Sequence, residues 1–140
     1  MVKIKAKIRY RGVSTIEAAI VFPVLLLITF GAIEYGWLFL KAQQVTNVAR
    51  TGAREAVRAG AVPQDVVNEI QFAMQKAGIS NYDAPIITPG SFSNLAAGDP
   101  ITVQVSVDLA DVNSPLVNFP GIMLPAKLKA SVTMAREGPS

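Results

Sequence analysis

The longest apolar stretch of the chain extends from Val13 to Leu40, and Glu17 and Glu34 are its only charged residues. A membrane hydrocarbon core of about 30 Å is crossed by roughly 20 predominantly apolar helical residues. Counted from Val13, that length ends near Ile33. Residues 13–40 are therefore predicted to form a transmembrane helix whose far end reaches the headgroup region.

Aromatic and charged residues gather at that far end, where Tyr35 and Trp37 follow Glu34. Aromatic side chains are enriched at membrane interfaces, and charged side chains are tolerated at the same depth. We therefore expect Glu34 to lie at the outer edge of the membrane, in contact with lipid or with a neighbouring subunit.

The helical pattern continues over residues 41–60, until Gly60 and Pro63 interrupt it. The transmembrane helix is therefore predicted to extend outside the membrane as one rod. Within the membrane, Pro23 has no backbone N–H to donate, so it should kink the helix or loosen it locally.

Small side chains recur at helical spacing along this rod. Ala49, Ala53 and Ala56 stand at i, i+4 and i+7, and Ala32 and Gly36 form a shorter pair inside the membrane. Small residues at this spacing let helices approach closely. Both sets are therefore candidate helix-packing positions.

Three arginines, Arg50, Arg54 and Arg58, run beside the stripe of alanines. They can form a solvated basic face over a packed alanine face. Alternatively, they can pair with acidic groups of a neighbouring subunit or with lipid phosphates. The sequence leaves both interpretations open.

A second helix is predicted over residues 63–77, at the start of a head that comprises residues 61–140. Pro63 suits a first helical turn, an apolar stripe follows at helical spacing, and Gly78 is a natural stop. We interpret this stripe as part of a hydrophobic core.

Strict alternation of apolar and polar residues predicts two half-buried strands, at 101–109 and at 127–134. A short strand can form at 85–88. The predicted fold class is therefore α+β: a long N-terminal transmembrane helix, then a small head with one further helix and a short antiparallel sheet.

A long loop is predicted over residues 111–125, which include three prolines and Gly121. The apolar side chains of this loop either cap the small core or offer an exposed contact to a partner. They are Leu116, Val117, Phe119, Ile122, Met123 and Leu124.

The net charge of +3 originates in the N-terminal tail and not in a binding face. Five of the 13 basic residues lie in residues 1–12 without an acidic neighbour, which leaves 8 basic against 10 acidic residues in the rest. Local charge is what attracts nucleic acid or lipid, so we expect no nucleic-acid binding. The positive-inside rule predicts a cytoplasmic N-terminus and a head outside.

Enzyme chemistry is disfavoured, because the chain has no cysteine and no histidine. Their absence removes the thiol nucleophile, the soft metal ligands and the side chain best suited to proton transfer near neutral pH. Asp108 and Asp111 could hold a cation weakly, but turn chemistry explains them more simply. We therefore expect no enzyme activity, no cofactor and no metal.

Three interpretations of the N-terminal segment compete. A cleaved secretory signal would also begin with basic residues, but its apolar stretch is normally only about 7–15 residues long. A plain signal anchor would stay in the membrane uncleaved. In a prepilin-type leader, residues 1–12 would be removed after Gly12, and the mature chain would begin at Val13 with an acid, Glu17, at its fifth position.

The prepilin interpretation also explains the position of Glu17. A lone carboxylate near the edge of a span is costly and usually has a partner. Cleavage after Gly12 would create an α-amino group on Val13, which lies one helical turn from Glu17. Glu17 could pair with this amine in its own chain or in a neighbouring subunit.

The N-terminal half of the chain resembles the TadE-like family of the tight-adherence (Tad, or Flp) pilus system, whose first helix is similar to that of type IV pilins. The residues that carry this resemblance are Gly12, Glu17, Pro23, the box Ile33-Glu34-Tyr35-Gly36 and the stretch Asn47 to Arg54. The segments ITVQVSVDL and LKASVTMARE also resemble the strands that close these proteins.

The resemblance implies a non-enzymatic minor pilin or pseudopilin that supports pilus assembly or cell adhesion. A membrane aspartyl prepilin peptidase would cleave it after Gly12. Its other partners would be membrane lipid, pilin or pseudopilin subunits and the assembly platform of the bacterial inner membrane. It would cross this membrane once, and either stay there or be extracted into a periplasmic or surface filament. The alternative is a membrane-anchored periplasmic or extracellular binding module that never enters a filament.

Overall fold

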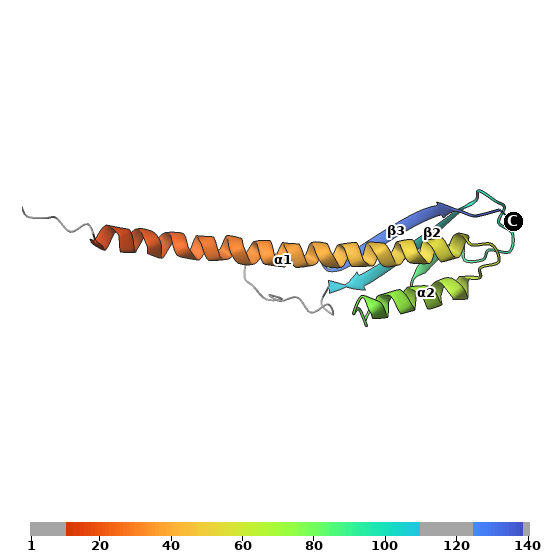
Figure 1. Ribbon diagram of the computed structural model, residues 1–140, viewed down its shortest axis with the longest axis horizontal. Helices are drawn as coiled ribbons and strands as arrows, with labels where there is room; N and C mark the ends of the chain where they lie inside the picture. The colour runs from red at the N-terminus through yellow and green to blue at the C-terminus, as the bar shows by residue number, and fades with distance from the viewer. Residues whose placement is uncertain (1–10, 110–124, 139–140) are drawn as a thin grey trace, which may run out of the picture.

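The computed structural model describes residues 11–109 and 125–138, so the basic tail and nearly all of the predicted loop 111–125 lie outside the described residues. The elements in chain order are α1 (Arg11–Val57), α2 (Pro63–Lys76), β1 (Ile86–Thr88), β2 (Pro100–Asp108) and β3 (Lys127–Ala135). Figure 1 shows α1 as a long rod whose C-terminal part carries the other elements. The predicted α+β fold is confirmed.

Helix α1 contains 47 residues, which corresponds to about 70 Å at 1.5 Å per residue. It begins two residues before the predicted start at Val13. It ends before Gly60, whose φ of +81° favours glycine. The helix runs without a break through Pro23, so the kink or loosening predicted there does not divide it.

Helix α2 begins and ends with recognisable capping interactions. Pro63 occupies its first position, and the Asp65 carboxylate accepts a hydrogen bond from the backbone N–H of Val62 at 3.2 Å. At the other end, Gly78 adopts a φ of +67° and Ile79 donates its N–H to the Met74 carbonyl at 3.0 Å. This is the Schellman arrangement, in which glycine reverses the chain and a buried apolar residue follows.

The sheet is antiparallel with the order β1-β2-β3. Strands β2 and β3 pair along their whole length, from Pro100 opposite Ala135 to Asp108 opposite Lys127. The apolar residues of β2 are buried, and its polar residues face outward, as the alternation predicted. On the outer face, the hydroxyl groups of Thr102 and Thr133 lie 2.8 Å apart.

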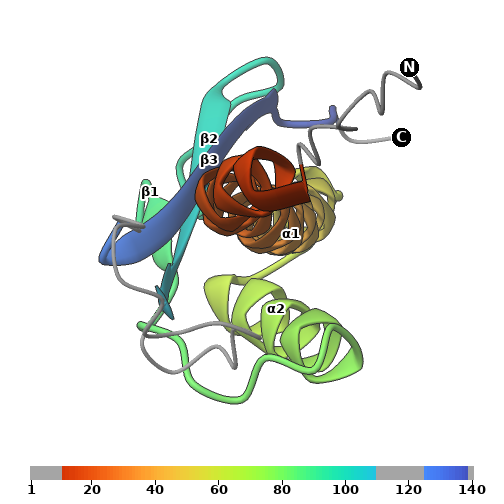
Figure 2. The same ribbon diagram turned by 90° about the vertical axis from the view of Figure 1, so that its left-hand side faces the viewer.

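The core of the head forms around the C-terminal part of α1. Figure 2 shows the sheet on one side of α1 and α2 on another. Helices α1 and α2 and strand β2 all contribute fully buried side chains. These are Val45, Ala49, Ala53, Ala56, Val66, Ile70, Met74, Ile101, Val103, Val105 and Val107. The head therefore cannot form its core without the helix that also carries the apolar N-terminal segment.

Gly52 lies where α1, α2 and β2 approach one another closely. A Cβ atom placed on Gly52 would lie 2.6 Å from Cγ1 of Ile70 and 3.4 Å from Cγ1 of Val103. Contacts between carbon atoms are normally about 3.5–4.0 Å, so any side chain here would displace its neighbours. The glycine therefore permits the three-element junction.

The end of the chain is tied back to the end of α1. Glu137 donates its backbone N–H to the carbonyl of Val57 at 3.0 Å. Arg136 donates one hydrogen bond from its backbone to Asp99, and its guanidinium donates another to the carbonyl of Phe92. The last strand, the segment before β2 and the end of α1 are thereby held at one end of the head.

Candidate membrane and assembly site

The first part of α1 exposes apolar side chains in every direction. All residues from Ser14 to Thr29 are exposed, and no part of the most apolar 18-residue window of α1 is buried within the protein. The large apolar members are Ile16, Ile20, Val21, Phe22, Val24, Leu25, Leu26, Leu27 and Ile28. A surface helix of a soluble domain would instead bury one apolar side.

The polar group of Thr29 is satisfied inside this exposed segment. Its hydroxyl donates a hydrogen bond to the Leu25 carbonyl at 2.8 Å, so it does not need water. Residues 14–33 would measure about 30 Å as a helix, the thickness of a hydrocarbon core. The segment therefore has the length, surface and internal hydrogen bonding of a single-pass membrane anchor.

Glu17 is the only charged residue of residues 14–33, and its side chain is exposed. No ion pair joins it to another described residue. The backbone at Gly12 and Val13 already belongs to the first turn of α1, which places Val13 one turn before Glu17 on the same side of the helix. A free amine at Val13 would thus lie within reach of this carboxylate.

The two sets of small residues occupy different environments. Ala49 and Ala53 are 0% exposed and Ala56 is 1% exposed, because they pack inside the head of the same chain. Ala32 is exposed, and nothing lies within 4 Å of a Cβ placed on Gly36. Only the second pair is therefore open to close packing with another helix.

Glu34, which the sequence places at the outer edge of the membrane, has its side chain inside the protein. It is 1% exposed and is the only charged residue among the buried ones that the structure describes. Trp37, one turn further, packs against the core, and the Lys41 ammonium lies 5.8 Å from its ring centroid. The environment of α1 therefore changes near Glu34, from an exposed apolar segment to one that packs within the protein.

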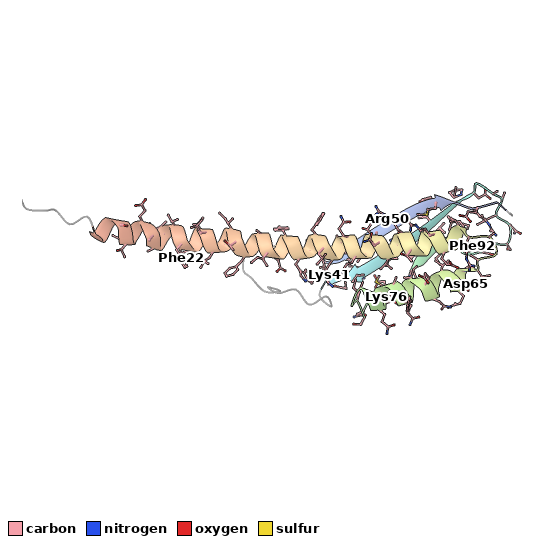
Figure 3. All side chains as sticks on the ribbon, in the orientation of Figure 1. Phe22, Lys41, Arg50, Asp65, Lys76 and Phe92 are labelled. Carbon is pink, nitrogen blue, oxygen red and sulfur yellow. The ribbon has the colours of Figure 1, made fainter. Side chains whose placement is uncertain are left out.

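The three arginines do not share one environment. Arg50 and Arg54 are exposed, and neither forms an ion pair with another described residue. Arg58 donates from Nη2 to Oε1 of Glu55 at 2.5 Å, and this hydrogen bond raises the pKa of Arg58. Arg50, which Figure 3 labels, and Arg54 therefore offer the two available positive charges of the stripe.

The structure contains a polar cluster on the outer face of the sheet that the sequence did not predict. Oδ2 of Asp83 accepts hydrogen bonds from Lys127 at 2.8 Å and from Ser106 at 2.6 Å. The hydrogen bond from Lys127 is the main cause that lowers the pKa of the Asp83 carboxyl. These residues are far apart in sequence, so no local pattern indicated the cluster.

The described part of the chain contains no cluster of side chains that could bind a metal ion. Within residues 11–109 and 125–138, no three acidic, histidine or cysteine side chains are grouped so that they could hold an ion. Asp111, one of the two aspartates considered for a weak cation site, lies outside these residues.

Comparison with known proteins gives one match. The model of a family described as TadE-like protein matches residues 12–54. The match begins at Gly12, covers the exposed apolar segment and ends inside the packed part of α1. No curated protein and no solved structure matches the chain.

Proposed function

Because residues 12–54 match the model of the TadE-like protein family, we propose that this chain is a minor pilin or pseudopilin of a Tad-type pilus system. The N-terminal tail lies in the cytoplasm, the first part of α1 crosses the inner membrane, and the head projects outside. A prepilin peptidase removes residues 1–12, and the mature chain supports pilus assembly or adhesion.

The observation that carries this proposal is the division of α1 into two surfaces. Its first part is exposed and apolar on all sides, whereas its second part supplies the core of the head. An apolar surface of this extent needs lipid or other apolar helices around it. A pilin requires both environments in turn, because it moves from the membrane into a filament.

The continuity of α1 also disfavours an ordinary cleaved signal peptide. The residues that follow the apolar run are helical, and Val45 and Val48 among them are buried in the head. A signal peptidase that cleaved after the apolar run would have to cut a peptide bond within this packed helix. Cleavage at Gly12, in contrast, lies in the first turn of α1, at a helix end that frays easily.

Glu17 has the role of pairing with the new amine of Val13, in its own chain or in a neighbouring subunit. The carboxylate is exposed on an otherwise apolar surface, where an unpaired charge is unfavourable. The amine exists only after cleavage. Maturation would therefore convert Glu17 from an isolated charge into one member of an ion pair.

Glu17→Gln tests this role in the native host. The variant should still be cleaved after Gly12, because the scissile bond is unchanged, but it should be depleted from the assembled fraction relative to the unmodified chain. Gln71→Glu, an exposed substitution on α2, serves as the control and should assemble normally. Equal assembly of Glu17→Gln and of the control would show that Glu17 has no pairing role.

The alternative function is a membrane-anchored binding module that stays out of filaments. It predicts that the full chain remains in the membrane fraction with residues 1–12 attached. Recovery of only this uncleaved form from a host that produces the peptidase and the pilus would favour the alternative.

A further inference from the structure

The sheet of the head has one long edge that no described strand covers. The order β1-β2-β3 places β3 at this edge, and its nine residues include no proline. Helices α1 and α2 lie against the inner face of the sheet, toward which the buried residues of β2 point (Figure 2). An uncovered strand edge presents a row of backbone N–H and C=O groups with which another strand can pair.

Two hydrogen bonds show which backbone groups of β3 point outward. Leu109 donates its N–H to the Ala126 carbonyl at 3.0 Å, and Arg136 donates its N–H to the Asp99 carbonyl at 2.9 Å. They continue the β2–β3 register at its two ends, and bonded pairs alternate with non-bonded pairs in an antiparallel ladder. The even-numbered residues of β3 therefore bond to β2, and the odd-numbered residues direct their N–H and C=O groups to the free edge. These are Lys127, Lys129, Ser131, Thr133 and Ala135.

The opposite edge of the sheet, at β1, is protected by prolines. By the same alternation, Ile86 and Thr88 bond to β2, so Pro85, Ile87 and Pro89 face outward. Proline has no N–H to donate, which leaves Ile87 as the single outward donor of residues 85–89. Short strands and prolines are common protections of a sheet edge, and β3 has neither.

Burial of the inner face declines toward the free edge. Each inner-face residue of β2 is 0% exposed, whereas three residues that pair with them on β3 are only half-buried. The pairs are Ile101 with Met134, Val103 with Val132 and Val107 with Leu128. A further strand would cover these side chains with its own inner-face residues, so its sequence needs an apolar residue at every second position.

The outer face of the same edge carries an available positive charge at Lys129. This residue is exposed and forms no ion pair with another described residue, whereas Lys127 pairs with Asp83 at 2.8 Å. Opposite charges that face each other across neighbouring strands stabilise the pairing. The strand that fits this edge therefore carries an acidic residue opposite Lys129.

A second copy of the chain does not fit this edge. Its β1 edge is protected, and two β3 edges related by a two-fold axis perpendicular to the strands would pair antiparallel. Figure 1 shows β3 running along α1 in the same direction, so such a pair would point the two α1 helices in opposite directions. Two copies anchored in one membrane cannot adopt this arrangement.

We propose that β3 binds an extended segment of a different protein, which adds a fourth strand antiparallel to β3. The segment alternates apolar and polar residues, lacks proline and places an acidic residue opposite Lys129. In strand addition, main-chain hydrogen bonds give affinity, and alternate side chains give specificity. The inference goes beyond the proposed function and rests on it only where it excludes a second copy.

Peptide binding to the full chain in detergent micelles tests this contact. The probe is a fluorescein-labelled peptide as long as β3, in which valine alternates with threonine and glutamate. Its fluorescence anisotropy should rise when the chain is added. A peptide of the same composition with its valines in one block should bind more weakly, because it cannot match the two faces of the sheet.

Ser131→Pro tests the edge itself. It removes an outward N–H but no hydrogen bond to β2, so β3 can stay in the sheet. Peptide binding should weaken by at least about tenfold, since a hydrogen bond is lost and the proline ring obstructs the edge. Ser131→Thr keeps the N–H and should bind normally, and Trp37 fluorescence shows whether each head is folded.

Lys129→Glu tests the charge of the edge. This variant should bind the glutamate peptide more weakly than the unmodified chain does. It should prefer a peptide in which lysine replaces glutamate. An unchanged preference would contradict the acidic character assigned to the partner.

N-methylated peptides test the pairing with the protein unmodified. In antiparallel pairing, the peptide residues on the outer face direct their N–H groups to β3. N-methylation of the threonines and glutamates should therefore abolish binding, and N-methylation of the valines should not.

Three results would each overturn the proposal: no rise in anisotropy, equal binding of the two N-methylated peptides, or equal binding by folded Ser131→Pro and Ser131→Thr chains. Flotation with lipid vesicles and the mass of the mature chain report the anchor and the cleavage separately. A chain that floats and is cleaved but does not bind the peptide refutes only the strand addition.

Discussion

At the residue scale, two positions acquire their meaning only from tertiary contacts. Gly52 is one of several small residues on α1, and Ile70 and Val103 converge at its position. Glu34 belongs by sequence to the membrane edge, yet its side chain is 1% exposed. Periodicity predicts which side of a helix is apolar, but it does not show which residue meets a third element or how far along the helix the head extends.

Gly52→Val should destabilise the head by about 1–3 kcal/mol, the usual effect of adding bulk to a packed core. The new side chain would overlap Ile70, since even a Cβ atom would lie 2.6 Å from it. Unfolding in detergent can be followed through the fluorescence of the single tryptophan, Trp37, which packs against the core.

Gly36→Val is the matched control, because a Cβ at Gly36 meets nothing within 4 Å. It should leave the unfolding of the head unchanged. A Gly52→Val head as stable as this control would show that the three elements do not meet as closely as described.

The Asp83 cluster predicts an acid-sensitive contribution to stability. Its hydrogen bonds, chiefly the one from Lys127, lower the pKa of Asp83 below its ordinary value of 3.8. A carboxyl whose pKa is lower in the folded state stabilises the fold above its unfolded pKa, and this contribution disappears as the pH falls through the folded pKa. Since the carboxyl is exposed, the contribution should be small.

Asp83→Asn removes this ionisation and should flatten the dependence of the unfolding midpoint on pH below about 4. Lys127→Met removes the main partner and should have a similar effect. The expectation fails if the midpoint of either variant falls with acidification as steeply as that of the unmodified chain.

At the element scale, helix α1 has two parts with different surfaces, and the sequence pattern distinguishes them. The uniformly apolar stretch correctly predicted a long helix whose apolar side chains are exposed, and the striped pattern beyond it correctly predicted a continuing helix with buried alanines on one side. Alternation likewise placed β2 and β3 to within about a residue. The order of the strands and the contact between α2 and Gly52 could not be predicted, because they depend on segments distant in sequence.

Val24→Lys should weaken membrane insertion of α1 by about 2.5–3.5 kcal/mol, the insertion penalty of a lysine near the centre of a span. Val24 is 54% exposed and contributes nothing to the core of the head, so the unfolding of the head should not change. Flotation with vesicles measures the first effect and Trp37 fluorescence the second. Asn47→Lys adds the same charge outside the span and should float normally; equal flotation of both variants would contradict the assignment of the anchor.

At the scale of the whole molecule, the structure is a rod with a head folded onto its far half (Figures 1 and 2). The head takes part of its core from α1, so any movement of the anchor is transmitted rigidly to the head. Its exposed charges Arg50 and Arg54 lie on α1 beyond the exposed apolar segment. The molecule therefore presents an apolar surface and a charged surface at separate heights along one helix.

The mass of the chain purified from its native host, with the prepilin peptidase present, tests the central claim most directly. The account predicts a mature protein that begins at Val13 and lacks residues 1–12, whose new amine lies one helical turn from Glu17. A chain that still carries residues 1–12, or one cut after the apolar run, would contradict it.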